Sequence, residues 1–155
     1  MLNDYMFGGL EINKFRETSS AHCTIGFSAT KNDERFLVTA GHCVDDTTYM
    51  YQGGEIIGAN HFNYQGSKAD VGLIKLTSDK YLTSKLYKGS TMPMGQYTSY
   101  QEARQDMSIG DKVCTSGATT GFQCGEIIST YGSQATGDSL FPGLIVTSGM
   151  DTEAG

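Results

Sequence analysis

His42 is the side chain in this 155-residue sequence that is best placed to do acid–base chemistry. It follows the apolar run at 36–40 and Gly41, and Cys43 comes directly after it. Such a run is typical of a strand entering a packed core, and a glycine lets the backbone turn tightly where a side chain would obstruct it. A histidine fixed where a strand leaves the core can take a proton from a nucleophile. We therefore interpret His42 as a candidate general base, with a purely structural histidine as the alternative.

The four cysteines form two close pairs, Cys23 with Cys43 and Cys114 with Cys124. Four cysteines allow three disulfide connectivities, and pairing within each close pair is the simplest. Disulfides indicate an oxidising compartment, and therefore a secreted, extracellular protein. Each cysteine of the first pair directly follows a histidine, in His22-Cys23 and His42-Cys43. A tetrahedral zinc site of two cysteines and two histidines is therefore the alternative. Neither Cys-x-x-Cys nor His-x3-His spacing is present, so we favour disulfides and expect no metal and no other cofactor.

Short extended segments must position these residues. Apolar runs and alternations separated by glycine or polar turns predict six strands in the first half of the chain. The six are residues 10–12, 21–29, 36–40, 49–51, 55–59 and 71–76. The polar cluster at 31–34 predicts a hairpin between the second and third strands, which would bring Cys23 near Cys43. We expect His61 and Phe62 in a loop. Without helical periodicity, these strands predict a small antiparallel barrel or sandwich.

The second half of the chain begins with a change of composition. Residues 77–106 are rich in Ser, Thr, Tyr, Lys and Gln, and we expect a surface crossing between two units there. The strand pattern returns at 112–116 and 121–128, which predict a hairpin whose two cysteines could bridge across it. One more strand is expected at 144–147. The second unit is therefore shorter than the first.

The composition excludes several classes of partner. The formal net charge is -6 and the sequence pI is about 4.9, which argues against nucleic acid because phosphate binding needs clustered Lys and Arg. No apolar run approaches the roughly 18–20 residues of a membrane span, so we expect no membrane insertion. Residues 1–5 have neither the basic nor the apolar region of a signal peptide. An exported chain with this start would be a processed or partial product.

Three blocks of this sequence resemble the chymotrypsin-fold serine peptidases (peptidase S1 family). The first two are Thr-Ala-Gly-His-Cys at 39–43 and Ala-Asp-Val-Gly-Leu-Ile at 69–74. The third, Val-Cys-Thr-Ser-Gly-Ala-Thr-Thr-Gly-Phe-Gln-Cys-Gly at 113–125, is similar to the bacterial streptogrisin and alpha-lytic branch. Gly-Gly-Leu-Glu at 8–11 resembles the mature N-terminus of that branch, although Phe7 stands where Ile or Val is usual. The blocks follow the family's order over nearly the whole chain.

The resemblance implies an all-β fold of two six-stranded antiparallel barrels with the active site in the cleft between them. We expect an N-terminal barrel over 7–90 and a partial C-terminal barrel over 91–155. His42 matches the general base, and Asp70 matches the carboxylate that fixes the histidine tautomer. The cysteine pairs match the two local disulfides of the branch. The resemblance also implies a polypeptide substrate and a monomer.

The nucleophile is the missing part of this resemblance. The family carries it in a Gly-Asp-Ser-Gly-Gly motif, and counting from Gly125 puts the first glycine of that motif at Gly155. The backbone N–H of Gly155 would then form half of the oxyanion hole. Gly137-Asp138-Ser139 comes too early and lacks the following glycine pair, so we interpret it as a surface turn.

The sequence therefore predicts an N-terminal portion of a serine endopeptidase. Without the nucleophile, the 155 residues alone are expected to be inactive. The alternative function is a non-catalytic homologue that uses the barrel surface to bind a partner. The two hypotheses differ in whether the full coding sequence yields peptide hydrolysis.

Overall fold

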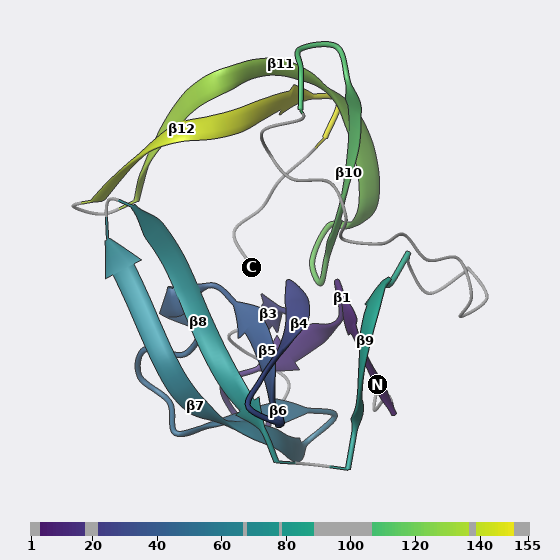
Figure 1. Ribbon diagram of the computed structural model, residues 1–155, viewed down its shortest axis with the longest axis vertical. Helices are drawn as coiled ribbons and strands as arrows, with labels where there is room; N and C mark the ends of the chain where they lie inside the picture. Colours follow the sequence, from purple (N-terminus) through teal and green to yellow (C-terminus); the bar gives the residue numbers. More distant parts are fainter. Residues whose placement is uncertain are drawn as a thin grey trace.

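The structure, a computed structural model, describes residues 4–17, 22–66, 68–77, 79–88, 107–136 and 139–150. In Figure 1 the strands group into two units, the first up to β9 and the second from β10 onward. The strands are β1 (Tyr5–Gly8), β2 (Glu11–Asn13), β3 (His22–Thr24), β4 (Phe27–Lys31), β5 (Glu34–Thr39), β6 (Tyr49–Gln52), β7 (Glu55–Gly66), β8 (Ala69–Leu76), β9 (Tyr81–Leu86), β10 (Lys112–Gly117), β11 (Gly121–Thr136) and β12 (Ser139–Ser148). One turn of 3-10 helix, η1, spans Gly41–Cys43. The predicted all-β class is confirmed.

The core of the first unit lies inside a curled, seven-stranded antiparallel sheet with the order β3-β2-β6-β7-β8-β5-β4. Alternate residues of β8 point inward, so Gly72, Ile74 and Leu76 are buried while the residues between them are partly exposed. Fully buried apolar side chains from most of the strands meet there: Met6, Ile12, Ile25, Leu37, Met50, Ile57 and Ile74. Burial of these side chains is the main force that stabilises the unit. No helix among the described residues has the length and apolar character needed to cross a bilayer.

The predicted hairpin is present as β4 and β5, which pair through the turn at Asn32 and Asp33. Both turn residues have positive φ, the conformation that two-residue hairpin turns favour and that Asn and Asp tolerate. The single strand expected at 21–29 is wrong, because the chain breaks it at Ile25 and Gly26 into β3 and β4. These two strands form opposite edges of the seven-stranded sheet. The break therefore carries the chain around the corner that curls the sheet into a barrel.

The long strand β7 overturns the loop expected at His61 and Phe62. β7 begins at the Gly-Gly turn, as predicted, but continues to Gly66 and pairs with β8 along that length. Both side chains are exposed, and the His61 ring lies 5.1 Å from the ring of Phe36. Because the outer face of β7 borders solvent, polar residues there do not interrupt the strand.

The region predicted as a surface crossing contains one strand, β9, which pairs in parallel with β1. Ser28 Oγ donates a hydrogen bond of 2.6 Å to the carbonyl of Thr83, and this bond joins β4 to β9. The first unit thus has nine strands among the described residues, where six were expected. The additional strands are β1, β9 and the one created by the break after β3. The expected boundary at residues 90 and 91 lies outside the described residues.

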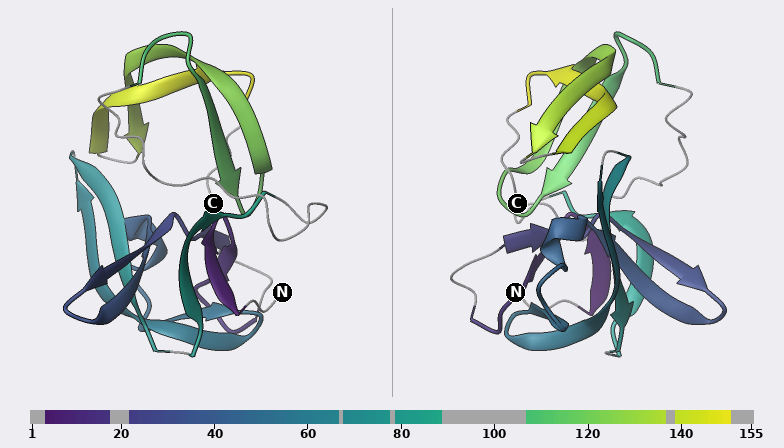
Figure 2. Two further views of the ribbon diagram at one scale, coloured as in Figure 1. Left: turned by 45° about the vertical axis from the view of Figure 1, so that its right-hand side comes forward. Right: turned by 90° about the vertical axis from the view of Figure 1, so that its left-hand side faces the viewer.

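The second unit is a curved sheet of three antiparallel strands, β10-β11-β12. The hairpin predicted around 117–120 is confirmed, with Cys114 opposite Cys124, and the strand predicted at 144–147 is part of β12. In both views of Figure 2 this sheet forms a layer apart from the barrel of the first unit. Ile127 is its one fully buried apolar side chain among those described. The two residues between β11 and β12, Gly137 and Asp138, lie outside the described residues.

Candidate active site

The residues that follow β5 form a short turn that carries His42. The N–H groups of Cys43 and Val44 bond the carbonyls of Ala40 and Gly41 at 3.1 and 3.0 Å, which closes η1 around the histidine. The cysteine after His42 is fully buried and forms a disulfide with Cys23. The backbone at His42 is therefore fixed on both sides, as a catalytic base requires.

Asp70 lies in β8 and holds His42 by two hydrogen bonds, one to the imidazole and one to the backbone. Its Oδ2 is 2.6 Å from His42 Nδ1, and its Oδ1 accepts the His42 backbone N–H at 3.1 Å. A carboxylate only accepts hydrogen bonds, so Nδ1 carries the proton and the lone pair of Nε2 stays available. The side chains of His42 and Asp70 are 51% and 27% exposed, so the pair lies at the surface of the unit and a substrate can reach it. This geometry is what the predicted roles of a general base and its orienting carboxylate require.

Gly41 allows this close approach because it has no side chain. A Cβ at that position would lie 2.6 Å from the carbonyl oxygen of Tyr64, 2.8 Å from Asp70 Oδ1 and 3.0 Å from the carbonyl oxygen of Val71. Two of these three atoms belong to backbone that cannot move without shifting β7 or β8. The predicted role of this glycine, a turn that a side chain would obstruct, is therefore confirmed by the space around it.

Gly41→Ala is expected to lower the free energy of unfolding by about 1–3 kcal/mol, the usual cost of an overpacked site. The added methyl group must push Asp70 or the ends of β7 and β8 away from His42. Urea unfolding measures the effect. Gly117→Ala is the matched control, because there the added Cβ meets only Thr120 Oγ1, at 3.2 Å. Equal urea midpoints for Gly41→Ala and the wild-type protein would contradict this account.

Two residues that support the turn were missed by the sequence analysis. Gly72, in β8, lies so close to Ala40 and Val44 that an added Cβ would collide with both. Asn60, in β7, donates from Nδ2 to the carbonyls of Val44 and, at 3.2 Å, of Thr47. Both contacts join distant segments, so the local pattern gives no signal of them. For Asn60, the only signal in the sequence is a polar side chain in the middle of a strand.

A charged cluster holds the segment that follows the turn. Lys14 Nζ lies 3.1 Å from Asp45 Oδ1 and 2.7 Å from Asp46 Oδ1. Gln65 Nε2 donates to Asp45 Oδ2 at 3.0 Å, and Gln65 is the cross-strand neighbour of Asp70. The bond from Gln65, followed by those from Lys14, lowers the pKa of Asp45 from 3.8 to about 2. The cluster thus connects the segment after His42 to the strand beside Asp70.

The Asp45 cluster is expected to make stability depend on pH in the acid range. Because the folded pKa lies below the unfolded value, the contribution of Asp45 is fully present above about pH 4 and is lost as the pH falls toward about 2. The free-energy difference between wild-type and Asp45→Asn protein, measured by urea unfolding, should therefore shrink across that interval. Asp79→Asn, at another exposed carboxylate, is the control and should show no such trend. A difference that stays constant from pH 5 to pH 2 would contradict the prediction.

Both expected disulfides are present. Cys23 and Cys43 have Cα atoms 6.1 Å apart, and Cys114 and Cys124 have Cα atoms 4.0 Å apart. All four thiols are used in these bonds, which overturns the zinc alternative. Among the described residues, no three His, Cys, Asp or Glu side chains gather as metal ligands would.

The remaining site predictions concern the nucleophile and the oxyanion hole. Gly155 lies outside the described residues, so its expected role stays a prediction. Ser139, the serine of the Gly-Asp-Ser sequence, is opposite Thr136 where β12 begins. The structure thus brings His42 and Asp70 together. Within the part of the chain that the structure describes, no serine is hydrogen-bonded to His42.

Comparison with known proteins identifies the family to which the chain belongs. The family model described as Trypsin matches residues 15–149. Streptogrisin-D from Streptomyces griseus is 36% identical over 137 residues, which cover 83% of this chain and 32% of that protein. Glutamyl endopeptidase 2 from the same organism is 26% identical over 122 residues, or 76% of this chain and 61% of that protein. The chain therefore spans less than two thirds of the length of these curated relatives.

A solved structure agrees with the sequence comparisons. The Nocardiopsis protease NAPase superposes with a TM-score of 0.73 at 28% identity, over 93% of this chain and 71% of that one. The predicted resemblance to chymotrypsin-fold peptidases and to their streptogrisin and alpha-lytic branch is thus confirmed. Because the family model matches residues 15–149, which is more than half of the chain, this chain belongs to the trypsin family.

Proposed function

We propose that the protein is a serine endopeptidase and that these residues supply the base half of its catalytic machinery. The observation that carries the proposal is the 2.6 Å contact between His42 Nδ1 and Asp70 Oδ2, on a turn fixed by a disulfide. The membership of the trypsin family supports the same reaction class. Polypeptides are the proposed substrates.

Each residue has a definite task in this reaction. His42 Nε2 takes the proton of the nucleophilic serine as that oxygen attacks the scissile carbonyl, and later donates it to the leaving amine. Asp70 keeps the proton on Nδ1 and stabilises the imidazolium that forms. In this proposal the serine follows Gly155, and the N–H of Gly155 donates to the developing oxyanion. The reaction needs no cofactor beyond these groups.

We further propose that the protein acts outside the cell as a monomer. Two disulfides support an oxidising compartment, and the curated relatives are Streptomyces proteases. The net charge of -6 supports the expectation that nucleic acid is not a partner. The domain limits 7–90 and 91–155 remain part of the proposal.

Labelling with a fluorophosphonate probe tests the function, because the probe reacts only with a serine that a base has activated. The protein expressed from its full coding sequence should be labelled and should hydrolyse peptides. His42→Ala should abolish both, while His61→Ala, which changes an exposed histidine of β7, should leave both intact. A wild-type protein that is folded, unlabelled and unable to hydrolyse peptides would overturn the proposal and favour the non-catalytic homologue.

A further inference from the structure

Thr24, the last residue of β3, lies where the two units meet. Its Oγ1 accepts a hydrogen bond of 3.0 Å from the backbone N–H of Ala118, which is 94 positions away in the sequence. Ala118 belongs to the turn between β10 and β11, and this turn points toward β3 and β1 in Figure 1 and toward the first unit in both views of Figure 2. A hydroxyl of the first unit therefore holds the backbone of the second.

Thr24 is also connected to both sides of the His42 turn. Its carbonyl accepts a hydrogen bond of 2.7 Å from Thr39 Oγ1, and Thr39 is a buried residue at the end of β5. Its neighbour Cys23 is bonded through the disulfide to Cys43. A displacement of Thr24 would therefore be transmitted to His42 along two routes, through Thr39 before the turn and through Cys43 after it.

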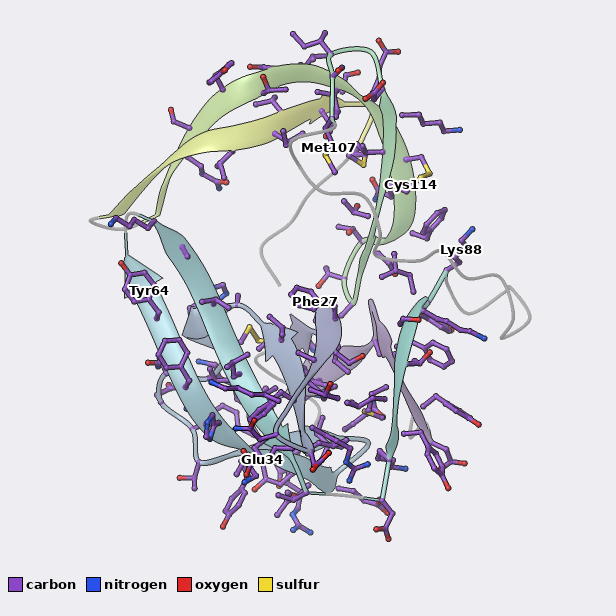
Figure 3. All side chains as sticks on the ribbon, in the orientation of Figure 1. Phe27, Glu34, Tyr64, Lys88, Met107 and Cys114 are labelled. Carbon is purple, nitrogen blue, oxygen red and sulfur yellow. A yellow bond between two sulfur atoms is a disulfide. The ribbon has the colours of Figure 1, made fainter. Side chains whose placement is uncertain are left out.

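Among the described residues, other contacts between the units involve segments that are not bonded to the His42 turn. Ser116 Oγ donates to the carbonyl of Tyr87, and Ser116 also lies against Gly9. Lys88, labelled in Figure 3 near the end of β9, lies 5.3 Å from the centre of the Phe122 ring. These contacts join the β10–β11 hairpin to the segments that follow β1 and β9. The Thr24 contact differs because it leads through Thr39 and Cys23 to the candidate base.

We propose that Thr24 is a positioning residue, whose hydroxyl fixes the second unit at the distance from His42 that catalysis needs. This inference rests on the proposed function, in which the nucleophile and the oxyanion donor belong to the second unit. Proton transfer needs donor and acceptor within hydrogen-bond distance, and a misplacement of about 1 Å can lower the rate about 100-fold. Thr24 contacts neither reacting atoms nor substrate in this scheme and acts through the β10–β11 turn.

Thr24→Val tests the role, because valine keeps the shape of threonine and removes the hydroxyl. In the protein expressed from its full coding sequence, we expect kcat to fall about 10- to 100-fold and KM to stay within about twofold. Thr24→Ser retains the hydroxyl and should restore kcat to within about threefold of wild type. Thr115→Val makes the same change at an exposed position of β10 and should have no effect.

Hydrogen exchange of single amides gives a readout that does not depend on activity. In Thr24→Val the Ala118 amide should exchange about fivefold faster or more, because it loses its acceptor. The amides of Ile25 and Gly26, which bond the carbonyls of Leu10 and Val38, should stay protected and so report that the barrel is folded. Thr24→Ser should keep the Ala118 amide protected.

The outcomes separate this inference from the proposed function. An active wild-type protein whose Thr24→Val variant keeps its kcat would overturn the positioning role and leave the proposed function standing. Unchanged exchange at Ala118 would overturn the contact itself. An inactive wild-type protein would overturn the proposed function, and the positioning role with it.

Discussion

Asp70→Asn is expected to lower the kcat of the proposed peptidase by about 10⁴-fold, the size of loss known for this change in serine peptidases of the same fold. The present geometry accounts for the direction. Asp70 Oδ2 accepts a hydrogen bond from the Nδ1–H of His42 at 2.6 Å. An asparagine that keeps its Oδ1 on the His42 backbone N–H must turn its amide N–H₂ toward Nδ1. The imidazole then carries its proton on Nε2 and cannot accept one from the serine.

Two measurements separate this effect from simple unfolding. Urea unfolding should show that Asp70→Asn remains folded, because the side-chain volume is kept and the bond to the backbone N–H can persist. The ¹⁵N chemical shifts of the imidazole should show the proton moving from Nδ1 to Nε2 in the variant. Asp79→Asn is the matched control and should change neither kcat nor tautomer. A variant of Asp70 that retains a tenth of the wild-type kcat would contradict the role of this carboxylate.

Local patterns predicted most of the strands but not how they close into a barrel. The turn at Asn32 and Asp33 is encoded by adjacent residues, so the β4–β5 hairpin could be predicted from them. The break at Ile25 and Gly26 depends on hydrogen bonds to Leu10 and Val38, which are distant in the sequence. The alternation of apolar and polar residues is the same whether the segment forms one continuous strand or breaks into two strands at opposite edges of the sheet. Non-local pairing is therefore what the sequence analysis missed.

The candidate site shows the same division. His42 could be found because an apolar run, a glycine and a cysteine surround it, and Asp70 because family resemblance fixes its block. Thr24 and Asn60 could not, since each acts through hydrogen bonds to segments at least thirteen positions away. Threonine and asparagine are common in strands and turns for other reasons. Their roles become visible only when the partner's position in space is known.

Loss of the Cys23–Cys43 disulfide is expected to lower the free energy of unfolding more than loss of Cys114–Cys124. The two bonds close loops of 20 and 10 residues, and loop entropy alone gives about 3 kcal/mol for either. The two disulfides differ in how deeply their sulfur atoms are buried. Cys23 and Cys43 are 3% and 0% exposed, whereas Cys114 is exposed and Cys124 is only partly buried. Removing the buried sulfur atoms leaves a void in the core, and its cost adds to the entropy.

Double alanine variants measure this difference. We expect Cys23→Ala with Cys43→Ala to cost about 3–5 kcal/mol in urea unfolding, near the upper end of values for native disulfides, and Cys114→Ala with Cys124→Ala to cost about 3 kcal/mol or less. Mild reduction followed by alkylation and mass spectrometry should modify Cys114 and Cys124 first. Only the first double variant should also impair labelling by a fluorophosphonate, because Cys43 directly follows the candidate base. Equal costs for the two variants, or earlier alkylation of Cys23 and Cys43, would contradict the effect expected from burial, and unimpaired labelling of the first variant would show that this disulfide does not anchor His42.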